Sequence, residues 1–159
     1  MKLQRAAKIM AMAVLCCGVG LVSGLSTKNA VAGWYLTLIK PPLNPPSRIF
    51  GVIWPVLYVL MGIAAGILWN KALARNVLYT ALGLFLFQLV LNGLWTPLFF
   101  GLQRIDLALI EIILLWVMIL ITTIVFYHCS KLAGVLLIPY LLWVSFAVYL
   151  NAGYWLLNR

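Results

Sequence analysis

Acidic side chains are almost absent from this sequence. Asp106 and Glu111 are the only carboxylates among 159 residues, and His128 is the only histidine. General acid–base catalysis and metal catalysis both need titratable groups that converge on one point. The spacing of these three residues places no two of them on one helix face. We therefore expect no conventional catalytic residues, no metal site and no required cofactor.

Cysteine is scarce as well, and its spacing excludes the common metal motifs. Cys16 and Cys17 are adjacent within an apolar run and Cys129 stands alone, so we expect inert thiols. The sequence also lacks an internal repeat, which duplicated transporters commonly show. Its eleven lysines and arginines lie at the ends of apolar runs and form no patch with exposed aromatics, which argues against nucleic-acid binding.

Apolar side chains, by contrast, are abundant. Hydrophobic residues make up 66% of the chain, charged residues 8%, and the mean hydropathy is +1.13. A soluble domain of this size cannot solvate such a surface, whereas lipid can. The composition predicts a multi-pass integral membrane protein, which we expect in a bacterial cell membrane with the N-terminal cations on the cytoplasmic side.

Five apolar runs approach or exceed the roughly 20 residues that cross a bilayer as a helix. They predict an all-α, five-transmembrane-helix bundle that forms a single domain over residues 1–159. The predicted spans are 6–25, 49–69, 77–100, 106–127 and 132–156. Residues 26–48 are predicted to form a proline-rich loop, because four prolines between positions 41 and 46 are incompatible with helix and strand.

The first apolar run allows two interpretations. Its charged start, its apolar core and the small residues Ala30, Val31 and Ala32 would suit a cleaved signal peptide. Its length favours a retained first helix. Two G-x-x-x-G motifs, 20–24 and 62–66, predict places where another helix approaches closely.

A polar stripe in the third run is the strongest candidate for a binding site. Five residues follow each other at steps of three and four, so they share one helix face: Gln88, Asn92, Trp95, Thr96 and Phe99. Amides avoid lipid, so this face is expected to point into the bundle. It would either line a ligand pocket or hold neighbouring helices together by hydrogen bonds.

Other side chains are candidates with competing interpretations. Trp34 and Tyr35 precede the proline-rich loop and would be either an interfacial aromatic belt or a lid over a pocket. Trp54 and Tyr58 are four residues apart and share a face, as do Trp143 and Ala147.

Two titratable residues and two prolines complete the candidates. Glu111 is expected to snorkel or to pair toward Arg104, with a proton or polar-ligand site as the alternative. His128 is expected at an interface, with haem ligation as the alternative. Pro97 and Pro139 are predicted to bend their helices.

Five segments, in order and with compatible spacing, resemble one family. They are Trp34-Tyr35, the run from Lys40 to Pro46, Trp54, the run from Gln88 to Gly101, and Pro139-Tyr140 with Trp143. Together they resemble the tryptophan-rich sensory protein / translocator protein family, also called the TspO/MBR or peripheral-type benzodiazepine receptor family, over residues 34–158.

The resemblance implies a five-helix bundle that forms a homodimer, with a pocket between helices beneath the first loop. It implies porphyrin ligands such as protoporphyrin IX and, in some members, cholesterol or benzodiazepine-type compounds. By matched position, Trp54, Asn92 and Trp143 resemble pocket residues, and Trp34 and Tyr35 belong to the loop above. Leu150, Tyr154 and Arg159 resemble the sterol motif of the family. The family usually has tryptophan where this chain has Leu43, which removes a ring from the expected lid.

The residues themselves fit such a ligand. Trp54, Tyr58, Trp95 and Trp143 offer rings on which a tetrapyrrole would stack. Gln88, Asn92 and Tyr35 offer hydrogen bonds, and Ala147 leaves space between Trp143 and Asn151. Lys40 and Arg48 would neutralise carboxylates.

The leading functional hypothesis is a membrane receptor or sensor for porphyrins, and for sterols as a second class, that affects tetrapyrrole level or transport. One alternative is a small transporter or exporter of these ligands. Another is light-dependent porphyrin degradation, in which Trp54 and Trp143 would act as electron donors. The expected partners are a tetrapyrrole, a cholesterol-like lipid, the membrane and a second copy of the chain.

Overall fold

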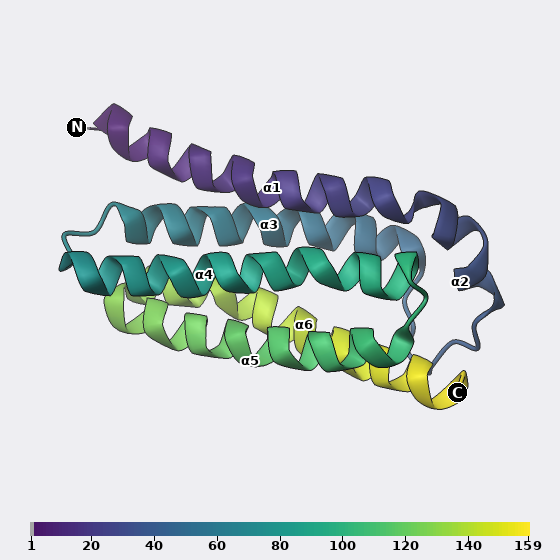
Figure 1. Cartoon of the computed structure of the whole chain (residues 1–159). Coiled ribbons are helices and arrows are strands. Elements are labelled where there is room, and N and C mark those ends of the chain that lie inside the picture. Colours follow the sequence, from purple (N-terminus) through teal and green to yellow (C-terminus); the bar gives the residue numbers. More distant parts are fainter. Residues whose placement is uncertain (1) are drawn as a thin grey trace.

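The computed structural model describes residues 2–159, except for the side chains of residues 26 and 28–31. The described chain is a bundle of long helices with no strand, as Figure 1 shows. The elements in order are α1 (Lys2–Ala32), α2 (Trp34–Thr37), α3 (Ser47–Trp69), α4 (Arg75–Thr96), the π-helical turn η1 (Pro97–Gly101), α5 (Ile105–Cys129) and α6 (Lys131–Leu157).

Five of these helical stretches are long and apolar enough to cross a membrane. They are Lys2–Leu25, Ser47–Trp69, Arg75–Gly101, Ile105–Cys129 and Lys131–Leu157. Each predicted span lies inside one of them. The prediction of an all-α, multi-pass membrane bundle is confirmed.

The connection between the first two spans differs from the expected loop over residues 26–48. Helix α1 continues to Ala32 and α2 occupies Trp34–Thr37, so the irregular segment is 38–46. The predicted span ended at residue 25 because polar residues follow it, but polar residues do not by themselves end a helix. The chain has no proline before Pro41, and α1 continues until Ala32, next to Gly33.

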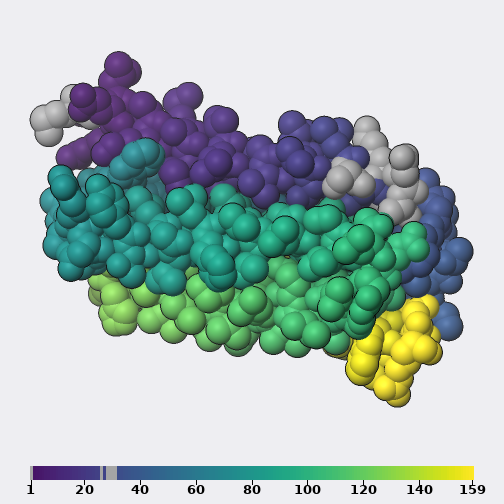
Figure 2. Space-filling view, in the orientation of Figure 1, coloured from purple at the N-terminus to yellow at the C-terminus, as the bar shows by residue number. Residues whose placement is uncertain are grey.

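The helices form a closed ring in which α1 packs along α3, α3 on α6, α6 on α5 and α5 on α4, with α1 also contacting α4 and η1. Figure 2 shows α1 covering one long side of the bundle. Glycines allow its close approach, because a Cβ on Gly62 would overlap the backbone of Ala13 and one on Gly66 would overlap Ile9. The 62–66 motif therefore forms the α1–α3 interface, as small residues do in membranes.

At Pro97 α4 gives way to the π-helical turn η1, and a bend of the helix there stays a prediction. Proline has no N–H with which to bond the carbonyl of Gly93. Within the turn, the amide of Leu102 donates to the carbonyl of Pro97 at 2.8 Å, five residues back. The resulting π-turn carries the chain into α5. It lies at the same end of the bundle as α2, segment 38–46 and the end of α6, which Figure 1 shows on the right.

Candidate functional site

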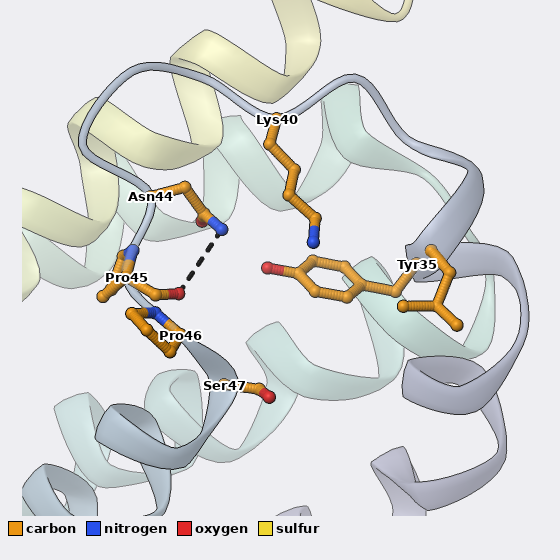
Figure 3. Close-up of a pocket in the computed structure, with 7 residues that line it drawn as sticks. Tyr35, Lys40, Asn44, Pro45, Pro46 and Ser47 are labelled. Carbon is orange, nitrogen blue, oxygen red and sulfur yellow. Dashed lines mark hydrogen bonds between the residues drawn. The ribbon is translucent and has the colours of Figure 1, made fainter.

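A cavity of about 220 Å³ lies at this end of the bundle, between α2, segment 38–46 and the start of α3. Figure 3 shows the Lys40 side chain extending toward Tyr35 across it, with Ser47 on the opposite side. The Lys40 Nζ atom is 5.8 Å from the centre of the Tyr35 ring. The lining residues are Tyr35, Leu36, Lys40, Asn44, Pro45, Pro46 and Ser47.

The electrostatics of the cavity favour an anion. Lys40 contributes a positive charge, and no acidic residue lines the space. Ser47 begins α3, a helix of 23 residues whose first turn has no side-chain cap. Free backbone N–H groups at a helix N-terminus carry partial positive charge and attract carboxylate or phosphate groups. Arg48 is exposed and does not line the cavity.

Hydrogen bonds fix segment 38–46 to the C-terminal half of α6. The Tyr154 hydroxyl donates to Asn44 Oδ1 at 2.9 Å and lies 2.6 Å from the Tyr35 hydroxyl. Asn158 accepts from the Ile39 amide at 2.8 Å and donates to its carbonyl at 3.0 Å. The part of the chain expected as a lid is therefore tied down in this structure.

Leu43, the departure from the family pattern, lies in a turn outside the cavity. The Asn44 amide donates to the Pro41 carbonyl at 3.3 Å, and Leu43 has φ 64°, which is the arrangement of a type II turn with proline at its second position. The Leu43 side chain is 79% exposed and does not line the cavity. Leu43 therefore contributes nothing to the cavity lining.

Predicted aromatic residues meet beside the cavity. Phe99 is almost fully buried, and its ring centre lies 5.7 Å from Trp34, 6.5 Å from Tyr35 and 4.9 Å from Trp95. The Trp95 Nε1 atom donates to Asn151 Oδ1 at 3.0 Å. The structure therefore brings three of the predicted site residues into one cluster, although Phe99 at its centre was predicted only as part of the stripe.

A second aromatic group lies between α3 and α6. Trp54 packs against Tyr58 with ring centres 5.6 Å apart, and against Tyr140 at 6.4 Å. Trp143 makes an edge contact with Phe50 at 5.6 Å. The Nε1 atom of Trp143 is buried without a hydrogen-bond partner. Ala147 is half-buried and packs against the core.

The two predicted amides hold helices together. The Tyr58 hydroxyl donates to Asn92 Oδ1 at 2.5 Å, Asn92 Nδ2 donates to the Tyr140 hydroxyl at 2.9 Å, and that hydroxyl donates to Gln88 Oε1 at 2.9 Å. All four residues are buried. Of the two interpretations of the stripe, interhelical bonding among α3, α4 and α6 is what these side chains do here, and pocket lining stays a prediction.

Tyr140 is the residue of this network to which sequence reasoning gave no role. The available signal was its position beside Pro139 in one of the family segments. Gln88 keeps a free donor, because its Nε2 atom is buried without a partner.

The residues of the sterol motif do not share an exposed face. Leu150 and Tyr154 are each 4% exposed, and Tyr154 is used to hold segment 38–46. Arg159 is exposed and lies 5.4 Å from the Trp155 ring. Sterol binding at this motif stays a prediction.

The predicted pairing of Glu111 with Arg104 is wrong. Arg104 forms a two-pronged ion pair with Asp106, with Nε–Oδ1 at 2.8 Å and Nη2–Oδ2 at 2.6 Å. Asp106 is only two residues from Arg104, so the Arg104 guanidinium pairs with Asp106 and not with Glu111. Glu111 is 9% exposed and neither carboxylate oxygen has a hydrogen-bond partner.

His128 is exposed at the far end of α5. Within residues 2–159, no three of the histidine, cysteine and acidic side chains gather in a way that would hold a metal ion.

Comparison with known proteins gives consistent matches over most of the chain. The model of the TspO/MBR family matches residues 12–156. The tryptophan-rich protein TspO of Chlorobaculum tepidum is 40% identical over 137 residues, which is 86% of this chain and 87% of that protein. The protein CrtK of Rhodobacter capsulatus is 34% identical, over 91% of this chain and 89% of CrtK. The translocator protein of Bos taurus is 35% identical, over 88% and 83% respectively.

Proposed function

This chain belongs to the TspO/MBR family, and from that premise we propose that it is a membrane receptor or sensor that binds a porphyrin such as protoporphyrin IX. The ligand carboxylates would occupy the electropositive cavity at Lys40, and the ring would lie against the neighbouring aromatic side chains. Binding in this way would control the level or the movement of the tetrapyrrole.

The juxtaposition of a cationic cavity and an aromatic cluster carries the proposal. Tyr35 lines the cavity and also packs against Phe99 in the cluster. A porphyrin has the matching arrangement, because its acidic side chains project from one edge of a wide π-face. A sterol has no acidic group and would make no use of Lys40.

The size of the cavity indicates how the ligand would enter. About 220 Å³ lies below the roughly 300–1,000 Å³ of most ligand pockets, so the cavity in this structure has room for the carboxylate edge alone. Admission of the ring requires segment 38–46 to move away from α6. The bonds of Asn44 to Tyr154 and of Ile39 to Asn158 would break in that step.

The test is quenching of tryptophan fluorescence by protoporphyrin IX in purified, detergent-solubilised protein. We expect saturable quenching, and an affinity about tenfold lower in Lys40→Met because one charge-assisted hydrogen bond is lost. Arg159→Met is the matched control, because it removes a cation from the same end of the bundle without touching the cavity. The dimethyl ester of the porphyrin, which has no carboxylates, should bind the wild type and Lys40→Met equally.

Trp143→Phe supplies an independent variant. Trp143 lies in the second aromatic group, against Phe50, and its indole N–H has no partner. If the porphyrin ring reaches that group, Trp143→Phe should weaken binding, and its unfolding temperature is measured beside it as the folding control. Quenching that never saturates and is identical in all variants would mean that the porphyrin only partitions into the micelle, and would overturn the proposal. Net flux of porphyrin into liposomes would indicate the transporter alternative.

A further inference from the structure

One end of the bundle carries positive charge without any acid to balance it. Lys2, Arg5 and Lys8 lie in the first turns of α1, Lys71 and Arg75 lie between α3 and the start of α4, and Lys131 begins α6. Both acids lie in the first turns of α5, at the opposite end, which Figure 1 shows on the right. The only ion pair found within residues 2–159 is also there, between Arg104 and Asp106.

A hollow of about 620 Å³ lies within this basic end, between α1 and α3. Figure 1 shows the N-terminal turns of α1 at the same end of the bundle as the end of α3. The residues that line it are Gln4, Arg5, Ala7, Lys8 and Asn70. Two cations and two amides thus line one open hollow, and no carboxylate lines it.

Local contacts position these groups around the hollow. Asn70 Nδ2 donates to the Arg5 carbonyl at 3.0 Å and to the Gly66 carbonyl at 2.9 Å, which joins the α1 backbone to the end of α3. The Lys8 Nζ atom lies 3.5 Å from the Trp69 carbonyl and 5.4 Å from the Trp69 ring. No ion pair in the described part of the chain engages Arg5 or Lys8, so both charges remain available to a ligand.

We propose that this hollow is a binding site for the phosphodiester headgroup of an anionic glycerophospholipid. The Arg5 guanidinium has the planar fork that matches two phosphate oxygens, and the Lys8 ammonium adds a point charge. Basic pockets between transmembrane helices are a recurrent way to hold such headgroups. The site is separate from the cavity at Lys40 and does not depend on the porphyrin proposal.

The position of the hollow along the helices identifies the phosphate as that of a lipid. It lies where two membrane spans, Lys2–Leu25 and Ser47–Trp69, reach their ends. Trp69 is partly exposed there, at the depth where tryptophan meets headgroups. Exposed apolar side chains such as Met10 and Val14 follow the hollow along α1 and would contact the acyl chains.

The experiment measures the affinity of the detergent-purified full chain for phosphatidylglycerol and for phosphatidylcholine, by native mass spectrometry and by the shift in unfolding temperature. The variant Arg5→Gln/Lys8→Gln removes both cations of the hollow. The matched control Lys71→Gln/Arg75→Gln removes the same charge from the same end but outside the lining. We expect selective binding of phosphatidylglycerol in the wild type and the control, and at least a tenfold loss in Arg5→Gln/Lys8→Gln.

Three results would overturn the proposal. An equal loss of affinity in both double variants would show that diffuse positive charge attracts the lipid. Equal affinity for phosphatidylglycerol and phosphatidylcholine would show that the site does not recognise the net negative charge of the headgroup. Competition by millimolar inorganic phosphate would identify a site for small free anions. If circular dichroism shows that Arg5→Gln/Lys8→Gln does not fold, Arg5→Lys decides: it keeps the charge, loses the fork and is expected to weaken binding.

Discussion

Replacing Tyr140 by phenylalanine removes one hydroxyl from the centre of the bundle. That hydroxyl accepts a hydrogen bond from Asn92 and donates one to Gln88, and the side chain is completely buried. The ring remains, so packing is conserved. Gln88 would be left with no partner at either end of its amide, because its Nε2 atom is already unpaired.

The expected loss in the free energy of unfolding follows from the number of hydrogen bonds that the substitution removes. An interhelical hydrogen bond in a membrane protein averages about 0.6 kcal/mol, with a maximum of about 1.7 kcal/mol. Two such bonds predict that Tyr140→Phe lowers the free energy of unfolding by about 1–3 kcal/mol. Tyr58→Phe loses a single bond to Asn92 and should cost about half as much.

The assay is reversible unfolding in mixed micelles, with Gln88→Met as the second arm of a double-mutant cycle. Methionine has nearly the shape of glutamine and needs no partner, so Gln88→Met should destabilise the wild type more than it destabilises Tyr140→Phe. If Tyr140→Phe is as stable as the wild type, or if Gln88→Met costs the same in both backgrounds, the network does not hold the helices together.

Three further outcomes test other parts of the structure. Glu111→Leu should raise the free energy of unfolding by about 1–3 kcal/mol, because a buried carboxyl without partners is removed; a lower melting temperature would contradict this. Gly62→Ala should lower the melting temperature by forcing α1 off α3, whereas Gly83→Ala, where a Cβ has open space, should not. Asn158→Ala should speed hydrogen exchange of the Ile39 amide, and Arg159→Ala should leave it unchanged.

The positions of the helices follow from local sequence, whereas their neighbours do not. Length and apolarity of a run are sufficient to place a span, which is why each of the five lies within an observed helix. The glycines at 62 and 66 indicated that some helix approaches closely. The sequence of α3 alone does not indicate that this partner is α1, because the choice of partner depends on how all the helices pack together.

The same division applies to the candidate site. The spacing of Gln88 and Asn92 correctly placed both amides on an inward face. Their shared partner, Tyr140, comes from a helix about fifty residues later, so the stripe alone left both pocket lining and interhelical bonding open. The cavity at Lys40 was also beyond local reasoning, because it exists only where segment 38–46 bends back over the start of α3.

The attachment of segment 38–46 to α6 has a consequence for the order of events during translation. Ile39 leaves the ribosome early, yet its partner Asn158 is 119 residues further along the chain. The Lys40 cavity therefore has no fixed wall while the first four spans enter the membrane, and it is completed after α6 has been synthesised. Nascent chains stalled before α6 is synthesised should already contain the α1–α3 pair and should show no protection of this segment from protease.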